Sequence, residues 1–351
     1  MNKARNICAM FLLTLALLAC EKNPAGEETI GAAAFVKTDY VDTVTTYGPA
    51  RMVRNLRQTQ NGDILIAAYN GIFRYDGKSF TNITSRIPSP SFWDVLEDRH
   101  GNLWMGTKDS GVYRFDGKEF RHFTTREGLP GNTVLHLHED RKGNIWFASG
   151  FTASRFDGKT FRHFTPQDGL AAVGVNTFFE DQKGRMWIGT RGDAYRFENE
   201  KFTLIRNQAG ETFYNVWSFA EDQKGNVWFG GSIVKEKRAS TLYLDVGLWR
   251  YNGETYQKVK EHSASSILAD KEGNLWTLGT ENAIGQGNWQ LMRFDAKTLQ
   301  EENPTGSQVF SIPIMLCQVI QARDGSIWFG SGRGVFRYDG QTITDLKKSG
   351  S

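Results

Sequence analysis

The sequence predicts an all-β fold, a seven-bladed β-propeller with four-stranded antiparallel blades. One element recurs seven times around a marker glycine, as in EDRHGNLWMGT at 97–107 and EDQKGNVWFGG at 221–231. A second element follows each copy, as in GVYRFDGKEF at 111–120. The marker glycines lie 39 to 52 residues apart. Seven copies of a unit with this period are typical of a propeller, whose blades number roughly four to eight.

Each unit is expected to form four short strands, A to D. In the third unit, strand A alternates over 133–139 and turns through D-x-x-G into strand B at 144–148. The aspartate of this turn can bond its own backbone, and the glycine takes the positive φ that a tight hairpin requires. Strand C carries an aromatic–Arg–aromatic pattern, and D-G-K leads into strand D, as at 119–124 in the second unit.

Two side chains recur once per unit in a way that indicates packing. A tryptophan fills one strand B position in six units, and Leu65 fills it in the first; the tryptophans are Trp104, Trp146, Trp187, Trp228, Trp276 and Trp328. An aromatic ring there is expected to pack between neighbouring blades. The strand C arginines are Arg74, Arg114, Arg155, Arg196, Arg250, Arg293 and Arg337. We interpret them as scaffold positions that are solvated or form ion pairs between blades.

The N-terminal residues read as a targeting segment that precedes the fold. Residues 1–20 combine a basic head, an apolar run and a small residue before Cys20, which is the layout of a signal peptide. LLAC at 17–20 resembles a bacterial lipobox and predicts lipidation of Cys20. Residues 21–34 are polar or small and predict a flexible tether, so the propeller is expected over 35–348. The β-branched and aromatic stretch 35–47 is expected to form a strand that joins the last blade and closes the ring.

The repeats resemble the two-component regulator propeller repeat, whose consensus runs roughly E-D-x-x-G-N-L-W-x-G-T followed by G-L-x-R-F-D. GLPGNTV at 128–134 also looks like the family's link into strand A, and the resemblance covers about residues 51–346. In that family the propeller is commonly the periplasmic sensor half of a membrane histidine kinase. No kinase or DNA-binding segment accompanies these repeats, so the resemblance implies a stand-alone form of the fold, without kinase signalling.

Composition narrows the classes of partner. The formal net charge falls from +3 to +1 once Lys3 and Arg5 leave with the signal, and no block of like charge remains, so nucleic acid is not expected. Of three cysteines only Cys317 lies in the body, which excludes an internal disulfide. We expect a bacterial envelope protein held to a membrane through its lipid anchor only. Glu21 after the lipidated cysteine favours the outer membrane, on its periplasmic or surface side.

Function is expected where the repeats differ from one another. The distance from the marker glycine to the strand C arginine is 12 or 13 residues in five units, but 25 in the fifth and 20 in the sixth. These insertions predict long B–C loops at 232–246 and 280–289, and a third expansion at 300–315 is expected in the D-to-A link that follows unit six. B–C loops and D-to-A links open on one face of a propeller. Long loops on a rigid scaffold commonly carry binding sites.

The function predicted from this asymmetry is a non-catalytic module that binds a ligand or an envelope protein through the face crowned by the three expansions. Basic and aromatic side chains on that face suit an anionic or carbohydrate-like ligand, or a protein epitope. The candidate ligand-binding residues are Arg51, Arg54, Trp93, Lys108, Arg191, Tyr214, Trp217, Lys235, Arg238, Trp289 and Arg333. For each residue taken singly, packing or plain solvation explains its presence equally well.

Catalytic and metal-binding signals are weak. His136 and His138 are two apart on one strand and face the same side, but no H-E-x-x-H, C-x-x-C or clear carboxylate partner accompanies them. We therefore expect channel-wall packing, no catalytic residue, no metal and no cofactor. Two alternatives stay open: a lyase-like enzyme with a site at the channel mouth, similar in fold to the streptogramin lyases, and an envelope scaffold protein without a small ligand.

Overall fold

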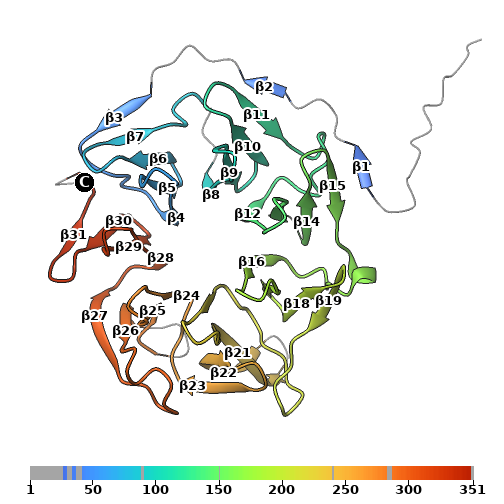
Figure 1. Ribbon diagram of the computed structural model, residues 1–351, viewed down its shortest axis with the longest axis vertical. Helices are drawn as coiled ribbons and strands as arrows, with labels where there is room; N and C mark the ends of the chain where they lie inside the picture. Colours follow the sequence, from blue (N-terminus) through green and yellow to red (C-terminus); the bar gives the residue numbers. More distant parts are fainter. Residues whose placement is uncertain are drawn as a thin grey trace, which may run out of the picture.

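The computed structural model describes residues 27–29, 34–36, 42–87, 91–149, 151–238, 241–282 and 287–348. Its β-strands form seven sheets arranged in a ring around a central axis (Figure 1). Each sheet contains four consecutive antiparallel strands, with the first strand innermost. The seven-bladed propeller predicted from the repeats is therefore confirmed. Residues 1–20, predicted to be a signal peptide ending at a lipidated Cys20, lie outside the described residues, so both stay predictions.

The blades are numbered along the chain, and each contains strands A to D in order. Blade 1 contains β4 (Val53–Gln58), β5 (Ile64–Ala68), β6 (Gly71–Tyr75) and β7 (Phe80–Asn82). Blade 2 contains β8 (Phe92–Glu97), β9 (Leu103–Thr107), β10 (Val112–Phe115) and β11 (Phe120–Phe123). Blade 3 contains β12 (Val134–Glu139), β13 (Ile145–Ser149), β14 (Thr152–Phe156) and β15 (Thr160–His163). Blade 4 contains β16 (Val175–Glu180), β17 (Met186–Thr190), β18 (Ala194–Glu198) and β19 (Lys201–Leu204).

The remaining three blades include the longest strands. Blade 5 contains β20 (Phe219–Glu221), β21 (Val227–Arg238), β22 (Thr241–Tyr251) and β23 (Tyr256–Lys260). Blade 6 contains β24 (Ser266–Ala269), β25 (Leu275–Thr280), β26 (Trp289–Phe294) and β27 (Gly306–Ile312). Blade 7 contains β28 (Leu316–Gln321), β29 (Ile327–Ser331), β30 (Gly334–Tyr338) and β31 (Ile343–Asp345). A 3₁₀ turn, η1 (Pro166–Asp168), lies in the link from blade 3 to blade 4, and no helix within the described ranges has the length and apolar character needed to cross a bilayer.

Three short strands near the N-terminus lie outside the seven repeats and extend blades at their outer edges. β1 (Glu27–Thr29) pairs with β15, β2 (Ala34–Val36) with β11, and β3 (Thr43–Thr45) with β7. The prediction that 35–47 joins the last blade is therefore wrong, because the open edge that it meets is strand D of blades 1 and 2. Contact with blade 7 comes just after it, where the Gly48 amide donates to the Leu346 carbonyl at 2.6 Å. Most of the predicted tether, 21–34, lies outside the described residues, so the tether stays a prediction.

The residues of the E-D-x-x-G-N-x-W motif each have a distinct structural task, which blade 3 illustrates. Asp140 accepts hydrogen bonds from the Lys142 and Asn144 backbone amides and from Trp146 Nε1, at 2.9 to 3.0 Å. Gly143 has a φ of +88°, which a side chain would strain. The aspartate thus holds the A–B hairpin and satisfies the buried indole N–H, which confirms its interpretation as a turn residue.

The glutamate of the same motif fastens adjacent blades. Glu139 accepts the Arg99 backbone amide of blade 2 at 2.9 Å, and Glu180 accepts the Arg141 amide of blade 3 at 2.9 Å. Equivalent bonds to Glu97, Glu221, Gln321 and Gln58 fasten four more junctions, including the one that closes the ring between blades 7 and 1. The junction of blades 5 and 6 has Ala269 at this position and lacks the bond.

The recurring tryptophans pack between blades, as predicted. Trp104 of blade 2 is 2 % exposed and lies in one core cluster with Phe147 and Phe156 of blade 3. The recurring arginines differ in part from the prediction. Arg114 lies over Trp104 at 5.4 Å, because the two are direct cross-strand neighbours, and three other arginines do the same in their own blades. Among these seven arginines in the described structure, the inter-blade ion pair is that of Arg155 with Glu200, at 2.7 Å.

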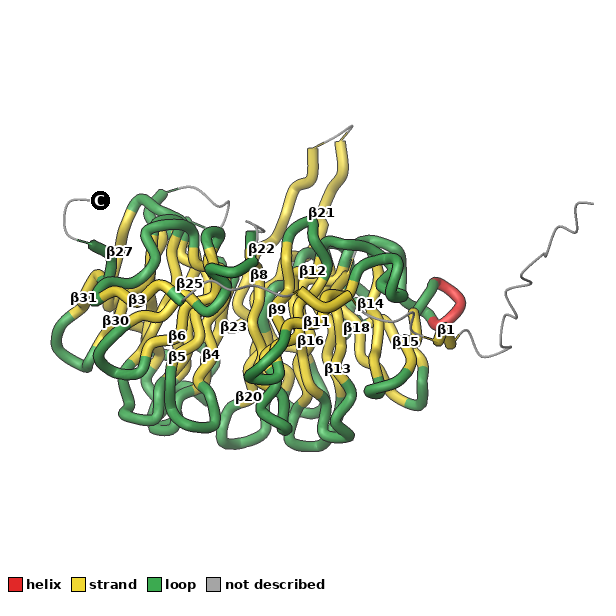
Figure 2. The backbone as a smooth tube through the Cα atoms, turned by 90° about the horizontal axis from the view of Figure 1, so that it is seen from above, coloured by secondary structure: helices red, strands yellow, loops and turns green. Residues whose placement is uncertain are grey.

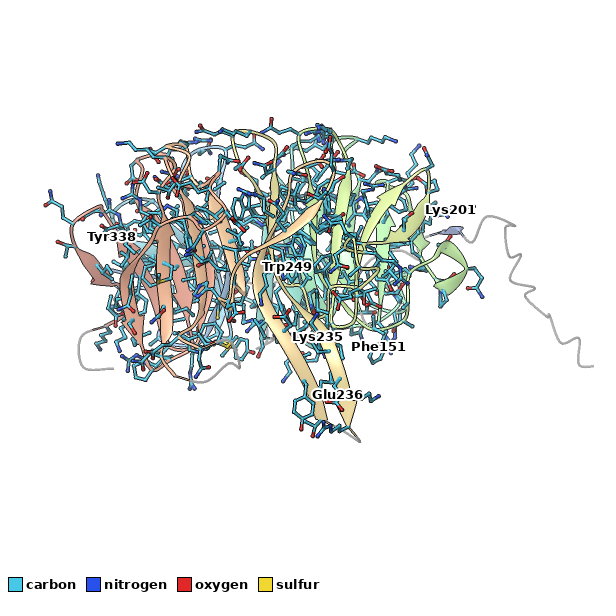
Figure 3. All side chains as sticks on the ribbon, turned by 90° about the horizontal axis from the view of Figure 1, so that it is seen from below. Phe151, Lys201, Lys235, Glu236, Trp249 and Tyr338 are labelled. Atoms are coloured by element: carbon cyan, nitrogen blue, oxygen red, sulfur yellow. The ribbon has the colours of Figure 1, made fainter. Side chains whose placement is uncertain are left out.

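The antiparallel order gives the propeller two unlike faces. B–C connections and D-to-A links open on one face, which we name the mouth face; A–B and C–D turns open on the other, the turn face. The predicted loop 232–246 is a β-hairpin, in which β21 and β22 stay paired from Ser232–Val246 to Arg238–Thr241. Figure 2 shows this hairpin projecting from the mouth face, and Figure 3 shows Lys235 and Glu236 along it.

The third predicted expansion is wrongly placed. Strand D of blade 6 begins only at Gly306, which pairs with Phe294, so the added residues form a long C–D turn over 295–305 on the turn face. The link from blade 6 to blade 7 is only 313–315. The cause is burial: Leu299, 2 % exposed, packs into the core between blades 5 and 6, and so delays the start of β27. Of the predicted expansions, 232–246 and the β25–β26 connection therefore open on the mouth face, whereas the residues added within 300–315 lie on the turn face and only 313–315 reach the mouth face; residues 283–286 of the β25–β26 connection lie outside the described structure.

Candidate functional site

A β-bulge near the start of strand A shapes the channel. In blade 2, Phe92 pairs with Thr107 and Asp94 with Gly106, so Trp93 is an extra residue without a cross-strand partner. The same one-residue shift occurs at Arg54, Leu135 and Asn176, and in blade 7 it falls at Cys317 and Gln318, which together lie opposite one residue of β29. A bulge lets two consecutive side chains face the same side, whereas a regular strand alternates them. In these five blades two successive strand A positions thus line the channel, and in blades 5 and 6 the equivalent residues lie at or just before the start of β20 and β24.

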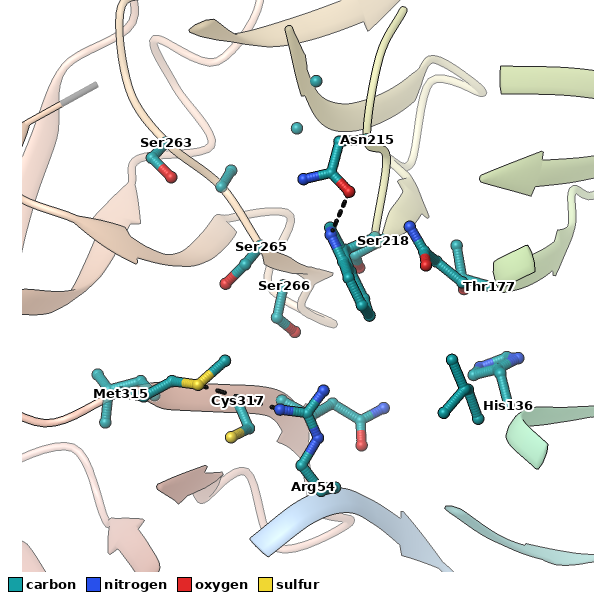
Figure 4. A pocket seen from close by; sticks show the side chains of 18 of the residues that line it. Arg54, His136, Thr177, Asn215, Ser218, Ser263, Ser265, Ser266, Met315 and Cys317 are labelled. Atoms are coloured by element: carbon teal, nitrogen blue, oxygen red, sulfur yellow. Dashed lines mark hydrogen bonds between the residues drawn. The ribbon is translucent and has the colours of Figure 1, made fainter. Parts of the chain in front are cut away.

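These two positions form two rings around a cavity of about 450 Å³ at the mouth face (Figure 4). The upper ring, nearer the mouth, consists of Arg54, Trp93, Leu135, Asn176, Trp217, Ser265 and Cys317. The lower ring contributes Asn55, His136, Thr177, Ser218, Ser266 and Gln318 to the lining. The wall above blades 5 to 7 adds Gly230, Gly231, Ser232, Leu244, Val246, Ser263, Ala264, Trp289, Met315 and Leu316, with Asn215 facing them from the link between blades 4 and 5.

The lower ring is polar in every blade because most of its members bond the backbone of the next blade. Gln318 Oε1 accepts the Leu56 amide at 2.5 Å, and Ser218 Oγ accepts the Ile267 amide at 3.1 Å. Asp94, Ser266 and His136 accept equivalent amides of the following blades. An amide left unbonded in this buried zone would be costly. The lower ring therefore serves primarily to hold the blades together.

Below the lower ring, an ion pair fills part of the channel. Arg57 of blade 1 donates from Nη2 to the Leu137 carbonyl of blade 3 at 2.8 Å, and from Nε to the Val95 carbonyl at 3.1 Å. Its Nη2 also lies 3.4 Å from Asp94 Oδ2. Asp94 is fully buried, and this burial raises its carboxyl pKa although Arg57 opposes the effect. This arrangement links three blades at the base of the cavity.

The two histidines of strand A belong to the same zone. Burial, assisted by the Arg57 charge, lowers the pKa of His136 well below its usual value and that of His138 to about 4. Both imidazoles are therefore neutral at neutral pH. His136 Nδ1 accepts the Phe178 amide at 3.4 Å, while its Nε2 lies 4.0 Å from Asp94. These contacts account for His136 as part of the channel wall.

The upper ring contains one cationic side chain, Arg54. Its guanidinium carbon lies 4.3 Å from the centre of the Trp93 ring, which itself stacks on Tyr69 at 6.1 Å. Met315 Sδ lies 4.0 Å from Nη1, a weak contact. Within the described residues Arg54 has no ion pair, and the cavity lining contains no aspartate or glutamate. Stacking thus orients a guanidinium whose charge is uncompensated.

The structure brings four of the eleven candidate residues together in the cavity: Arg54, Trp93, Trp217 and Trp289. Four others, Arg51, Lys108, Arg191 and Arg333, are exposed outside it. Tyr214 pairs with Ser232 through backbone bonds at the base of the hairpin. On the hairpin itself, Lys235 bonds Glu211 at 2.8 Å and Arg238 bonds Glu236 at 2.6 Å.

Several lining residues were missed by the sequence reasoning. Ser263, Ser265, Ser266, Met315 and Cys317 are small or unremarkable residues of blades 6 and 7. The signal that identifies the ring members is their position, four and three residues before the last residue of each strand A. Strict alternation assigns only one of those two positions to the channel, and the bulge adds the other.

The repeats recognised in the sequence are confirmed. The model of the two component regulator propeller family matches residues 86–109, 128–151, 169–192 and 210–232. No curated protein sequence matches the chain significantly. Several solved propellers share the fold.

Virginiamycin B lyase from Staphylococcus aureus is 12 % identical, with 83 % of this chain and 97 % of that chain covered and a TM-score of 0.57. YCF48, solved bound to D1 peptide, is 10 % identical over 88 % of this chain and all of that chain, with a TM-score of 0.59. PorZ, an essential bacterial surface component of the type-IX secretion system of Porphyromonas gingivalis, is 18 % identical over 85 % of this chain and 47 % of that chain, with a TM-score of 0.53. At these identities the likeness concerns the fold alone.

Proposed function

We propose that this chain, a propeller of two component regulator repeats, is a non-catalytic binding protein of the bacterial envelope whose ligand occupies the channel-mouth cavity. The observation that carries the proposal is the upper ring. Seven equivalent positions hold seven side chains of six different kinds around one cavity. At the motif positions of the A–B hairpin, by contrast, the blades mostly hold the same residue, because those positions share one structural task. The lower ring also varies, but its members are all polar and most of them bond the next blade, whereas among the described residues no such shared bond explains the upper ring.

The cavity suits a ligand in size and position. Its volume of about 450 Å³ falls within the roughly 300–1,000 Å³ that is usual for small-molecule pockets. Its side chains stand on strands that hydrogen bonds fasten into a rigid ring, so a binding geometry is held in place before the ligand arrives. The β21–β22 hairpin raises the wall on one side through Leu244 and Val246.

The envelope location is part of the proposal. It rests on the lipobox at 17–20, the predicted lipidation of Cys20 and the tether at 21–34, with Glu21 favouring the outer membrane. PorZ, which shares the fold, is a bacterial surface component. Labelling of the expressed full chain with an alkyne fatty acid should mark the wild type and not Cys20→Ser; equal labelling of the two would refute the anchor.

Filling the cavity tests whether it is the binding site. Leu135→Trp adds bulk at an upper-ring position that already holds tryptophan in blades 2 and 5, so the fold should tolerate it. Probes are pooled pentapeptides, uronic acid oligosaccharides and neutral oligosaccharides. We expect at least one pool to raise the melting temperature of the wild type, and the filled variant to lose that shift.

Lys118→Trp is the matched control, because Lys118 is exposed on a turn-face C–D turn. It should keep the full ligand-induced shift. Ser265→Trp, also in the upper ring, provides a second filled variant. A ligand that stabilises the filled variants as strongly as the wild type would overturn the proposal, as would the failure of every pool to stabilise the wild type.

A further inference from the structure

We infer that the ligand is a polypeptide with a free C-terminal carboxylate and an apolar last side chain, and that Arg54 receives the carboxylate. The inference rests on the proposed function, since it names the ligand class of the same cavity. It draws on three features of the lining: its charge, its uncharged polar groups and the apolar wall that continues beyond it.

Charge comes first. Arg54 is a partly buried guanidinium without an acidic partner among the described residues, and the lining holds no carboxylate. In Figure 4 its guanidinium points into the open space between the blades. Stacking on Trp93 restricts the side chain, so little rotamer freedom is lost when an anion binds. A planar fork of donors matches a carboxylate in two parallel hydrogen bonds.

The lack of acidic residues also limits what else the ligand carries. A free amino acid or a polyamine would bring an ammonium group into a cavity whose one charged side chain is cationic. The other polar groups are neutral, among them Ser263, Ser265 and Asn215. Neutral hydroxyl and amide groups suit peptide N–H and C=O groups, which need partners but carry no charge. The lining therefore favours a carboxylate joined to amides.

The apolar wall accounts for the last side chain and for the chain that precedes it. Leu244, Val246, Trp289 and Met315 line one side of the cavity. Val234 is the cross-strand partner of Leu244 and so lies on the same face of the hairpin, where both are about 40 % exposed. This apolar face continues from the cavity up the projecting hairpin. A polymer that enters end-first would run out along it, whereas a single small acid would leave it uncovered.

An acidic glycan presents the same carboxylate, but the wall disfavours it. Sugar hydroxyls require hydrogen-bond acceptors, and exposed Val234 and Leu244 provide none. A peptide ending in a leucine or phenylalanine would cover the same surface at a gain of roughly 25 cal/mol per Å² of apolar area. We therefore favour a peptide end, and a uronic acid oligosaccharide serves as the competing probe.

The test compares pools of pentapeptides that are identical except for a free acid or an amide at the C-terminus. Binding to the full-length protein is measured by calorimetry or by tryptophan fluorescence. We expect free acids with apolar last residues to bind at least tenfold more tightly than their amides. Arg54→Gln should abolish the discrimination, and Arg54→Lys should restore part of it. Arg51→Gln, which removes an exposed arginine outside the cavity, should leave it unchanged.

Failure of the inference and failure of the proposed function give different results. If acids and amides bind equally, and Leu135→Trp abolishes both, the cavity binds ligand but the carboxylate assignment is wrong. Preferential binding of the uronic acid oligosaccharide would overturn the peptide assignment in favour of a glycan. Binding that survives in Leu135→Trp would show that the cavity is not the site, and both proposals would fall together.

Discussion

The two ends of strand A follow opposite rules. At the turn face, its last residue is Glu or Gln in six blades, and in each it accepts a backbone amide of the preceding blade. At the mouth face, four residues earlier, the equivalent positions include Arg54, Trp93, Leu135 and Cys317. The residue type repeats at the turn-face end because a backbone amide of the preceding blade needs a hydrogen-bond acceptor there. The residues at the mouth-face end vary. Their side chains face a cavity, and within the described structure no hydrogen bond common to all blades requires a particular residue type there.

The junction of blades 5 and 6 lacks the Glu or Gln found at the turn-face end of strand A in the other blades, and other hydrogen bonds replace it. Ala269 offers no acceptor there, and Gln223 Nε2 instead donates to the Lys271 carbonyl at 2.8 Å. The long C–D turn of blade 6 adds a brace, since Gln300 exchanges hydrogen bonds with Asp222 and Asn226 of blade 5. The expansion on the turn face therefore has a structural explanation, whereas the hairpin on the mouth face bonds the link from blade 4 through Tyr214 and Glu211 near its base and projects beyond them.

The largest expected effect on stability is that of replacing Asp94, the buried carboxylate between the two ends of strand A. Asp94→Ala removes an acceptor from the Leu137 and Val95 amides and leaves Arg57 without its counter-ion. We expect a loss of about 3–5 kcal/mol in the free energy of unfolding, as for other broken buried ion pairs, measured by urea denaturation. Asp94→Asn, which matches Asn55 of blade 1, should recover part of it. A loss below about 1 kcal/mol would show that the inner linkage is unimportant.

Measuring stability at several pH values tests the buried zone between the two ends of strand A, because this zone contains His138. Burial lowers the pKa of His138 to about 4, whereas the unfolded chain has its ordinary value near 6.5. The unfolded state therefore binds more protons between these values, and His138 costs stability as the pH falls. His138→Phe introduces the residue that blade 4 has at this position. Between pH 7 and pH 4.5, the wild type should lose about 2.5 kcal/mol more of its free energy of unfolding than this variant does. Parallel pH profiles of the two proteins would contradict the assignment.

The smallest effects concern single fastenings at the turn face. Glu180→Ala leaves the Arg141 amide without its acceptor and should cost about 1 kcal/mol. Ala269→Glu places the missing acceptor near the Gln223 amide and should stabilise by up to about 1 kcal/mol. Neither change touches the cavity, so ligand affinity should stay the same in both. Destabilisation by Ala269→Glu would indicate that the Gln223 and Gln300 brace already fills this space.

The parts of the fold that could be predicted are those held by hydrogen bonds between residues close in sequence. The blade count, the Trp packing and the aspartate turn were all readable, because Asp140 bonds Lys142, Asn144 and Trp146 within six residues of itself. Strand D of blade 6 was misplaced because its start depends on Leu299 being buried against blade 5, which no local pattern reveals. The strand at 35–47 was assigned to the wrong blade for a similar reason: its composition indicates a strand but not a partner.

The sequence by itself determined the number of blades, their strand order and the rigid fastening of each turn, since those depend on short-range bonds repeated seven times. Only the tertiary structure decided which side chains meet at the mouth. Leu56 bonds Gln318 across 262 positions of the chain. Arg54 and Asn55 face the channel together only because a bulge breaks the alternation of β4. The cavity depends on ring closure and on this backbone irregularity, and neither has a signature in the order of residues alone.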